Sequence, residues 1–600
     1  MRNAEKFLGA CQPDHSLTRP SVVRLVVLIL LICPARSFPQ ARRTEMQHGI
    51  QNVGLFAQLK ARVAFGLTLA ISGGALATAQ AQSVGPGGSN VVTFKVESLR
   101  SSAPQHHPER GSVKLSQVPS LGTSRPSLPL NRHLSIFVSD VDTVSQIKFS
   151  EVMDKLVSQS GDPLLTKQLL FHQWWDSAGQ RPGLGLGPHC DDDAAPVPAS
   201  GVSTFTSLSM LNSFPYRCPR LEVNEASSDP FTNEADTNPA AYSAIAFSNR
   251  FDLVSPPGDC GEYRIVFARN SGKSDPLNRN LIIFEARVPN PKPAEGLNGC
   301  RPILEFWHGL SDETINAVER GKRLHDFYLE GLPASSVGPI VDVTHYALGT
   351  GQIRSNQFML NDKDVRLPAP PFDWTLREFK TFLNNGTLTI IPDSVKTNPG
   401  NSLFAAGSTD IRIGALNQDI RAQMKELLGG AGPASGVDDV NSIGFGTSGQ
   451  GVNSFESDEG QADLGDVLAA YAPGNKENPV IQANIAASLS LLRSPLTTLN
   501  VVSRLRTQTC AGCHQFSNND HGLGGKAIWP DKSKGDSTHP AMPFTQQSEK
   551  TSDLQPAIVG GGKRYAISLT VECLLDFREA FMKKALGISP ATSANHCPTQ

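Results

Sequence analysis

The stretch CGEYRIVFAR, residues 260–269, alternates large apolar and polar side chains at the spacing of an extended chain. The stretches LIIFEARV, residues 281–288, and ILEFW, residues 303–307, are similar in composition. Gly, Pro and Asn residues bound the three stretches, as is typical where strands begin and end. These residues therefore predict neighbouring strands of one sheet.

Segments with helical spacing lie on both sides of this strand region. Their ranges are 148–177, 311–331 with Ser311 as N-cap, 413–428, 461–471 and 480–493. We expect strand and loop over residues 340–361, and a short helix or strand over 374–385. Together these segments predict one large α+β domain with an antiparallel or mixed sheet over residues 133–430. A helical and loop connector follows over residues 431–493.

The overall composition is that of a loop-rich exported protein. The 600 residues have a formal net charge of −2, and only 18% of them are charged. This balance creates no strong electrostatic field, so we expect no nucleic-acid partner. The 52 glycines and 43 prolines favour an irregular, loop-rich chain over a compact helical enzyme.

Residues 46–81 have the parts of a secretory signal peptide. Lys60 and Arg62 precede a mildly apolar run of small residues, and Ala79-Gln80-Ala81 forms a cleavage signal. We expect cleavage after Ala81 and a periplasmic or secreted protein of bacterial type. Residues 82–132 are rich in Ser, Pro, Gly and Gln and predict a flexible linker.

Residues 1–45 form an upstream extension that need not be translated, because Met46 can serve as the start. The apolar run at residues 25–33 is too short for a comfortable membrane span. We therefore expect membrane contact only if this segment is retained.

The cysteines also favour an oxidising compartment. Six remain once Cys11, Cys33 and the two cysteines of the motif described next are set aside. An even number in an exported chain suggests three disulfides, with buried thiols as the alternative. The sequence does not choose among the pairings, and nearest neighbours are the simplest expectation. That pairing joins Cys190 to Cys218, Cys260 to Cys300, and Cys573 to Cys597.

The stretch RTQTCAGCHQFSNNDHG, residues 506–522, contains the pentapeptide C-x-x-C-H at residues 510–514. Random order of the same composition gives this pattern roughly 0.004 times per chain, so an accident is a poor explanation. Covalent haem needs only this local set: two thiols for the vinyl groups and an adjacent imidazole for the iron. A redox dithiol or a structural disulfide is an alternative. Zinc would need further ligands, drawn from His521, His539, Cys573, His596 and Cys597.

The pentapeptide resembles the haem site of c-type cytochromes. The resemblance covers residues 494–600 and implies a small, mostly helical haem domain. It also implies one covalent haem c bonded to Cys510 and Cys513, His514 as the proximal iron ligand, and one-electron transfer. The rest of the chain faintly resembles large uncharacterised exported bacterial proteins through CGEYRIVFAR, NRNLIIFEARVPNP and TCAGCH, and that likeness implies no activity.

The second axial position of the iron has several candidates. Met542 lies in the proline-stiffened loop HPAMP, and a thioether there would favour electron transfer. His521 and His539 are the imidazole alternatives, and an open site is a third. Three further residues, Arg504, Arg506 and Trp529, are candidates for contact with the haem propionates or for ordinary packing.

We therefore expect an exported mono-haem protein that transfers electrons to an unidentified redox partner, rather than a catalyst, and we assign no catalytic residue. One alternative is a disulfide-stapled binding or structural protein without haem, and another is a haem enzyme with an open iron site. The glycines of GFGTSGQG, residues 444–451, lack the preceding strand and following helix of a dinucleotide site, so no dinucleotide is expected.

Overall fold

The computed structural model describes residues 67–71, 75–79, 115, 118–174, 210–211, 214–215, 228–234, 237–275, 278–360, 372–384, 386–393, 395, 399–410, 412–429, 440–445, 466–472, 477–531, 539–542 and 544–588. The chain divides into two units, Met1–Ser101 and Ser102–Gln600. In the first unit, strands β1 (Leu67–Ile71) and β2 (Ala75–Ala79) pair antiparallel. Both lie inside the expected signal peptide, whose role in export stays a prediction.

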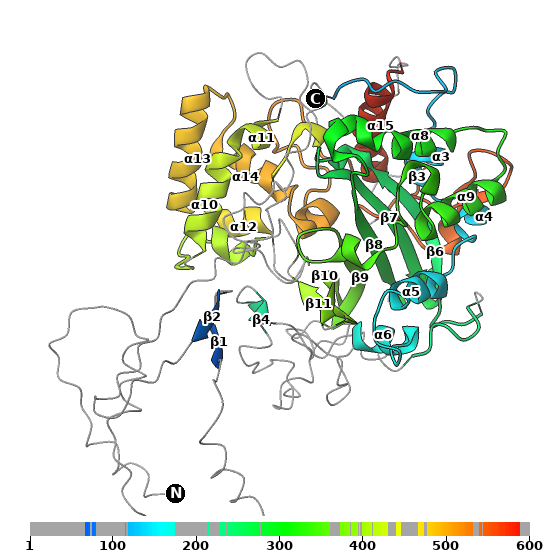
Figure 1. Ribbon diagram of the computed structural model, residues 1–600. Helices are drawn as coiled ribbons and strands as arrows, with labels where there is room; N and C mark the ends of the chain where they lie inside the picture. The colour runs from blue at the N-terminus through cyan, green and yellow to red at the C-terminus, as the bar shows by residue number, and fades with distance from the viewer. Residues whose placement is uncertain are drawn as a thin grey trace, which may run out of the picture. The chain divides into compact units, whose positions relative to one another are not determined.

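The second unit contains an antiparallel sheet of seven strands in the order β11-β10-β9-β8-β7-β6-β3 (Figure 1). Strands β6 to β11 pair with their sequence neighbours, so this part of the sheet is a simple meander. The expected mixed α+β fold is confirmed. The strands are β3 (Phe137–Val138), β6 (Tyr242–Arg250), β7 (Asp259–Arg269), β8 (Asn280–Pro289), β9 (Gln352–Leu360), β10 (Phe372–Asn384) and β11 (Thr387–Asp393). Two short hairpins, β4 (Met210–Leu211) with β5 (Phe214–Pro215) and β12 (Gln555–Pro556) with β13 (Lys563–Arg564), lie outside the sheet.

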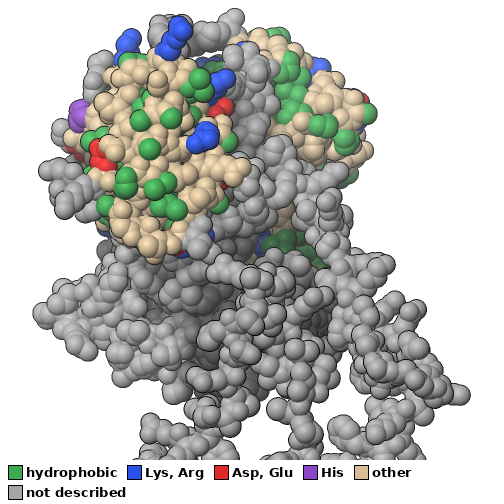
Figure 2. All heavy atoms as spheres, turned by 90° about the vertical axis from the view of Figure 1, so that its left-hand side faces the viewer, with side chains coloured by type: hydrophobic (Ala, Val, Ile, Leu, Met, Phe, Trp, Pro, Cys, Tyr) green, Lys and Arg blue, Asp and Glu red, His purple; other side chains and the backbone are tan. Residues whose placement is uncertain are grey.

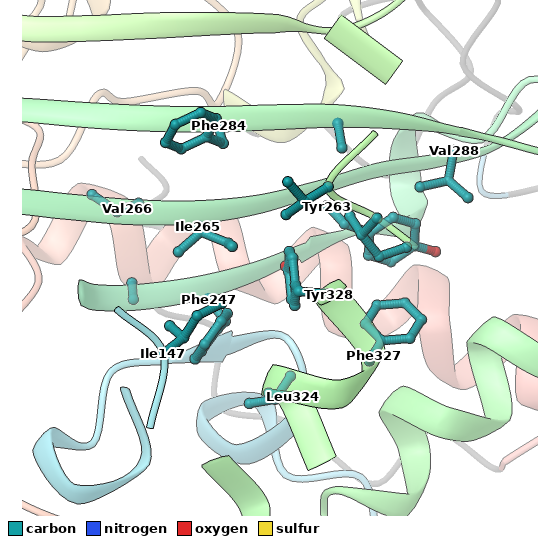
Figure 3. Packing of buried hydrophobic residues seen from close by; sticks show 14 of the residues in the cluster. Ile147, Phe247, Tyr263, Ile265, Val266, Phe284, Val288, Leu324, Phe327 and Tyr328 are labelled. Carbon is teal, nitrogen blue, oxygen red and sulfur yellow. The ribbon is translucent and has the colours of Figure 1, made fainter. Parts of the chain in front are cut away.

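One face of the sheet is apolar and covered by helices. Tyr263, Ile265 and Phe267 of β7 are fully buried on this face, as the alternation in their sequence predicts. The ring of Tyr263 lies 5.9 Å from that of Phe327, and Figure 3 shows the helix that carries Phe327 packed against these strands. The helices of this part are α3 (Arg132–Ser135), α4 (Val141–Val144), α5 (Phe149–Val157), α6 (Lys167–Trp174), α8 (Arg301–Gly309) and α9 (Ala317–Leu329).

The strand expected at residues 303–307 is wrong, because these residues belong to helix α8. Ile303, Leu304, Trp307 and His308 are buried, and this i, i+4 spacing is helical. Pro302 stands in the first turn of α8, where its missing N–H costs no hydrogen bond. The next helix begins later than expected, since Asn316 rather than Ser311 caps α9 by accepting a hydrogen bond from the Glu319 N–H.

A second group of helices forms its own apolar cluster beside the sheet domain. These helices are α10 (Ile413–Ala422), α11 (Met424–Leu428), α12 (Val467–Tyr471), α13 (Pro479–Leu492) and α14 (Thr498–Arg506). Leu416, Ile420, Ile485 and Leu505 are among the fully buried members of the cluster. In Figure 1 the group lies together, and Figure 2 shows one face of it with scattered apolar and basic side chains.

The apolar cores cut across the division expected at residue 494. Helix α14 contributes Val501 and Leu505 to the helical cluster. Helix α15 (Leu569–Leu586) contributes Leu575 and Phe581 to the core of the sheet domain instead. None of the helices in the described part of the chain is long and apolar enough to cross a membrane.

Candidate functional site

The C-x-x-C-H segment follows helix α14 directly. Thr497 caps this helix, since its hydroxyl accepts a hydrogen bond from the Asn500 N–H and the Asn500 side chain bonds back to the cap. The chain continues into a turn of π-helix over Gly512–Phe516, which contains Cys513 and His514. Such wide turns are rare and occur often at functional sites. The local sequence therefore places the pentapeptide on a compact helical turn.

Gly512 makes this compact turn possible. A Cβ atom at position 512 would lie 1.8 Å from the Arg506 carbonyl oxygen and 2.6 Å from Thr509 Oγ1. The Gly512 N–H donates to Thr509 Oγ1 at 3.1 Å, and the Cys513 N–H donates to the Thr509 carbonyl at 2.8 Å. A residue with a side chain cannot take this position without opening the turn.

The two motif cysteines lie half-buried against two different apolar patches, and neither is a half-cystine in the structure. Cys510 packs against Leu376 of β10, Val395 and Phe544. Cys513 packs against a second cluster, which we call the Trp529 cluster and whose members are Val440, Ile443, Leu523, Ala527, Trp529 and Cys573. A group bonded to both sulfurs would therefore meet the sheet domain on one side and the Trp529 cluster on the other.

Met542 belongs to a segment that is tied to the motif by hydrogen bonds. The Thr545 N–H donates to the His514 carbonyl at 2.9 Å, and the Thr545 hydroxyl donates to the Cys513 carbonyl at 2.9 Å. Met542 stands three residues before Thr545 and is 2% exposed. The segment that follows Met542 is thus bonded to the backbone of the motif through Thr545.

The two imidazole candidates have other partners. His539 is buried, and its Nε2 lies 3.5 Å from Glu572 Oε2 in helix α15. His521 is exposed and its Nε2 lies 3.1 Å from Asn519 Oδ1. His539 shares the Met542 segment, whereas His521 lies at the surface.

Two of the candidates for propionate contact, Arg504 and Arg506, are bonded to other groups of the protein. The guanidinium of Arg504 is fully buried and donates to the carbonyl oxygens of Leu523, Leu428 and Gly524 at 2.7, 2.7 and 2.8 Å. Arg506 is paired with Asp466 and Asp520. Both arginines therefore hold the loops around the motif together. Trp529 packs in the apolar cluster against which Cys513 lies. This is the packing role that was considered for it beside propionate contact.

The second face of the sheet carries a row of charged side chains, which we call the charged face. Its members alternate along their strands with the apolar residues of the other face: Arg250 of β6, Glu262 and Arg264 of β7, Glu285 of β8, Gln352 and Arg354 of β9, and Glu378 and Lys380 of β10. Arg354 donates to Glu378 at 2.9 Å and lies 3.4 Å from Glu285. The sequence analysis did not identify this row, although the E-x-R and E-x-K spacing of Glu262, Arg264, Glu378 and Lys380 was its visible signal.

The charges of this face stabilise one another although they are taken out of water. Burial opposes ionisation of Glu262, but the nearby guanidinium groups of Arg264 and Arg250 hold its pKa below the ordinary value. Burial likewise opposes the charge of Arg354, and Glu285, Glu378 and Cys510 outweigh it, so its pKa is raised. The pKa of Arg578 in helix α15 is lowered by burial and by the charge of Arg250.

One of the three expected disulfides is confirmed. Cys260 and Cys300 are joined, and this bond links β7 to the start of α8. Cys573 is also disulfide-bonded, while its expected partner Cys597 lies outside the described residues. Cys190 and Cys218 lie outside them as well.

A zinc site receives no support from the described residues. Within them, no group of three or more His, Cys, Asp or Glu side chains could hold a metal ion. Cys573, one of the residues considered as a zinc ligand, is oxidised to a disulfide. His596 and Cys597 lie outside the described part of the chain.

No protein-family model, no curated protein and no solved structure matches this chain. Function must therefore be argued from the residues of the chain itself.

Proposed function

We propose that this chain is an exported mono-haem protein of the c-type cytochrome kind that transfers single electrons. The observation that carries the proposal is the pentapeptide Cys510-Ala511-Gly512-Cys513-His514 on a helical turn, with Thr545, three residues after Met542, bonded to its backbone. Cys510 and Cys513 would form the thioether bonds, and His514 would be the proximal ligand. Bound haem c would supply an iron that alternates between two oxidation states.

The residues present suit such a group in their chemistry. Cys510, Cys513 and His514 are neither fully buried nor fully exposed, so a large planar group can reach them from outside the backbone. Apolar side chains, among them Leu376 and Trp529, lie against the two sulfurs, as an apolar macrocycle requires. Gly512 allows the close approach of its backbone to the Arg506 carbonyl, and Met542 is buried.

We assign Met542 as the preferred second axial ligand. It is buried on the segment that Thr545 fixes to the motif, whereas His539 lies close to Glu572 and His521 lies at the surface. A thioether ligand raises the reduction potential of haem and favours electron transfer over catalysis.

The test begins with periplasmic material from a host that matures c-type cytochromes. The expected results are a mass increase of one haem, a sharp reduced α-band, and loss of covalent haem in the double variant Cys510→Ser/Cys513→Ser. A chain without haem that keeps its disulfides would refute the proposal and favour a binding or structural protein.

The ligand assignment has a matched control. Met542 and Met582 are both 2% exposed, but Met582 lies in helix α15. In oxidised holoprotein, Met542→Leu should abolish the sulfur-to-iron charge-transfer band and lower the potential, whereas Met582→Leu should leave the band in place. A band that survives Met542→Leu would exclude Met542, and a five-coordinate iron in the wild type would favour a haem enzyme.

A further inference from the structure

Cys510 lies at the edge of the charged face. It packs against the cluster of Leu376 and Val395, and Leu376 precedes Glu378 by two residues on the same strand and therefore shares its face of the sheet. Glu378 is in register with Arg354 on β9 and accepts its hydrogen bonds at 3.1 and 2.9 Å. Arg354 is also close enough to Cys510 for a thiolate at that position to raise the pKa of its guanidinium. The motif is thus joined to the sheet through the packing of Cys510 against the cluster of Leu376 and Val395, and through the ion pair of Arg354 with Glu378.

The ion pairs continue from Arg354 across the neighbouring strands. Arg354 lies 3.4 Å from Glu285 on β8, and Glu285 lies 3.2 Å from Arg264 on β7. Arg264 pairs in turn with Glu262 at 2.5 Å on its own strand. On the other side, Lys380 Nζ lies 2.9 Å from Glu378. One continuous network therefore connects four strands to the vicinity of Cys510.

The described part of this network contains paired charges and one further cationic side chain close to them. The ion pairs on and beside the charged face join four carboxylates, Asp252, Glu262, Glu285 and Glu378, to four cationic side chains, Arg250, Arg264, Arg354 and Lys380. Arg578 of helix α15 is a fifth cationic side chain, which interacts electrostatically with Arg250 and Asp252. The Glu378 side chain is 0% exposed and that of Lys380 is 1% exposed, so water and salt screen these charges poorly.

We propose that the charged face of the sheet, acting through Arg354, holds the reduction potential of the haem on Cys510 high. This inference rests on the proposed function. Oxidised haem iron carries one more positive charge than reduced iron, so a nearby cationic group disfavours the oxidised state. The effect of a charge grows as the medium between it and the iron becomes less polar. Arg354 is the cationic member of the network that donates hydrogen bonds to Glu378, two residues from Leu376 on β10.

The large domain thereby acquires a role in the chemistry of the motif. Its apolar face builds the core, and its charged face supplies a fixed electrostatic environment whose arginines are oriented by the carboxylates beside them. Arg354 is in this sense a positioning and tuning residue, not a catalytic one.

The experiment measures the reduction potential of the holoprotein at pH 8 by spectroelectrochemical titration. Arg354→Gln removes a positive charge and should lower the potential. Glu378→Gln removes a negative charge at nearly constant volume and should raise it. Arg354→Lys keeps the charge and should stay close to the wild type. Arg323→Gln is the matched control, because Arg323 lies on α9 in an exposed pair with Glu319 and should change nothing.

Both network variants lose a buried ion pair, so their folding is checked by thermal unfolding in the same samples. If Arg354→Gln does not fold, Glu378→Gln and Glu285→Gln provide the test, since both should raise the potential. Opposite shifts for the arginine and glutamate variants, with none for the control, support the inference. Shifts of one sign, or no shifts with haem attached, overturn it and leave the proposed function standing. A wild type without haem overturns both.

Discussion

Replacing Gly512 by alanine should damage the fold and the proposed haem site together. The added Cβ would lie 1.8 Å from a backbone oxygen, that of Arg506, which cannot move aside as a flexible side chain can. Overpacking of this kind costs about 1–3 kcal/mol. Opening the turn also breaks the two hydrogen bonds to Thr509, worth about 1 kcal/mol each. Alanine regains about 1 kcal/mol of helix propensity, so the net loss should be about 2–4 kcal/mol.

The assay is the free energy of unfolding from urea titrations followed by circular dichroism, with covalent haem content measured in parallel. Gly414→Ala is the matched control, because this glycine stands in helix α10 and its added Cβ would meet no atom within 4 Å. That variant should be unchanged or more stable by up to about 1 kcal/mol. If Gly512→Ala is as stable as the wild type and binds haem fully, the packing argument for the motif is refuted.

Three further outcomes are expected. Removing the Cys260–Cys300 disulfide, whose cysteines are 40 residues apart, as the double alanine variant should cost about 4 kcal/mol of unfolding free energy, measured by urea titration; an unchanged free energy would contradict this. Burial lowers the pKa of His345, so the stability that the neutral imidazole contributes is complete above its unfolded pKa and is lost as the pH falls below about 6.5. His345→Asn should reduce this loss of stability, measured as the difference between melting curves at pH 7 and pH 5. Arg132 binds three carboxylates of helix α15, so Arg132→Met should cost about 3–5 kcal/mol in urea, whereas a surface-like loss below 1 kcal/mol would show that the ion pairs matter little. Those carboxylates are Glu572, Asp576 and Glu579.

The sequence could predict the strands whose periodicity was long and the disulfide that connects neighbours. β7 and β8 follow directly from the alternation in residues 260–269 and 281–288. The prediction of a strand at residues 303–307 was wrong, because so short an apolar run fits a strand and one turn of a buried helix equally well. Only the burial of Trp307 and His308, one turn beyond Ile303 and Leu304, distinguishes the two.

The charged face could not be predicted from the same alternation. Antiparallel sheets often have one solvated face, so Glu262 and Arg264 fit an exposed position as well as a buried one. Whether this face of the sheet is buried depends on segments that are distant in the sequence and lie over it. The ion pair of Arg279 with Glu549 and the hydrogen bond from Gln547 to the Ile245 carbonyl tie the chain after the motif back to the sheet. Contacts over such sequence separations leave no local pattern.

In the candidate site, too, some features could be predicted from the sequence and others could not. The motif residues Cys510, Cys513 and His514 were visible as a pattern, since their spacing is fixed by the chemistry of haem attachment. The sequence also favoured Met542 for the second axial position, but it kept His521 and His539 as alternatives because spacing does not fix the class of ligand. The hydrogen bond from Thr545 to the motif and the proximity of Glu572 to His539 became known only from the fold.

The sharing of cores between the two ends of the sequence also means that the segment with the proposed haem motif is no transferable module. Phe581 of helix α15 packs against Phe251, with ring centroids 6.0 Å apart, while Leu505 of α14 belongs to the helical cluster. A fragment cut at residue 494 would expose both surfaces to water and lose the partners of each. Duplication or fusion of this segment alone would therefore yield an unfolded tail, so the motif and the large domain must be inherited, and engineered, as one piece.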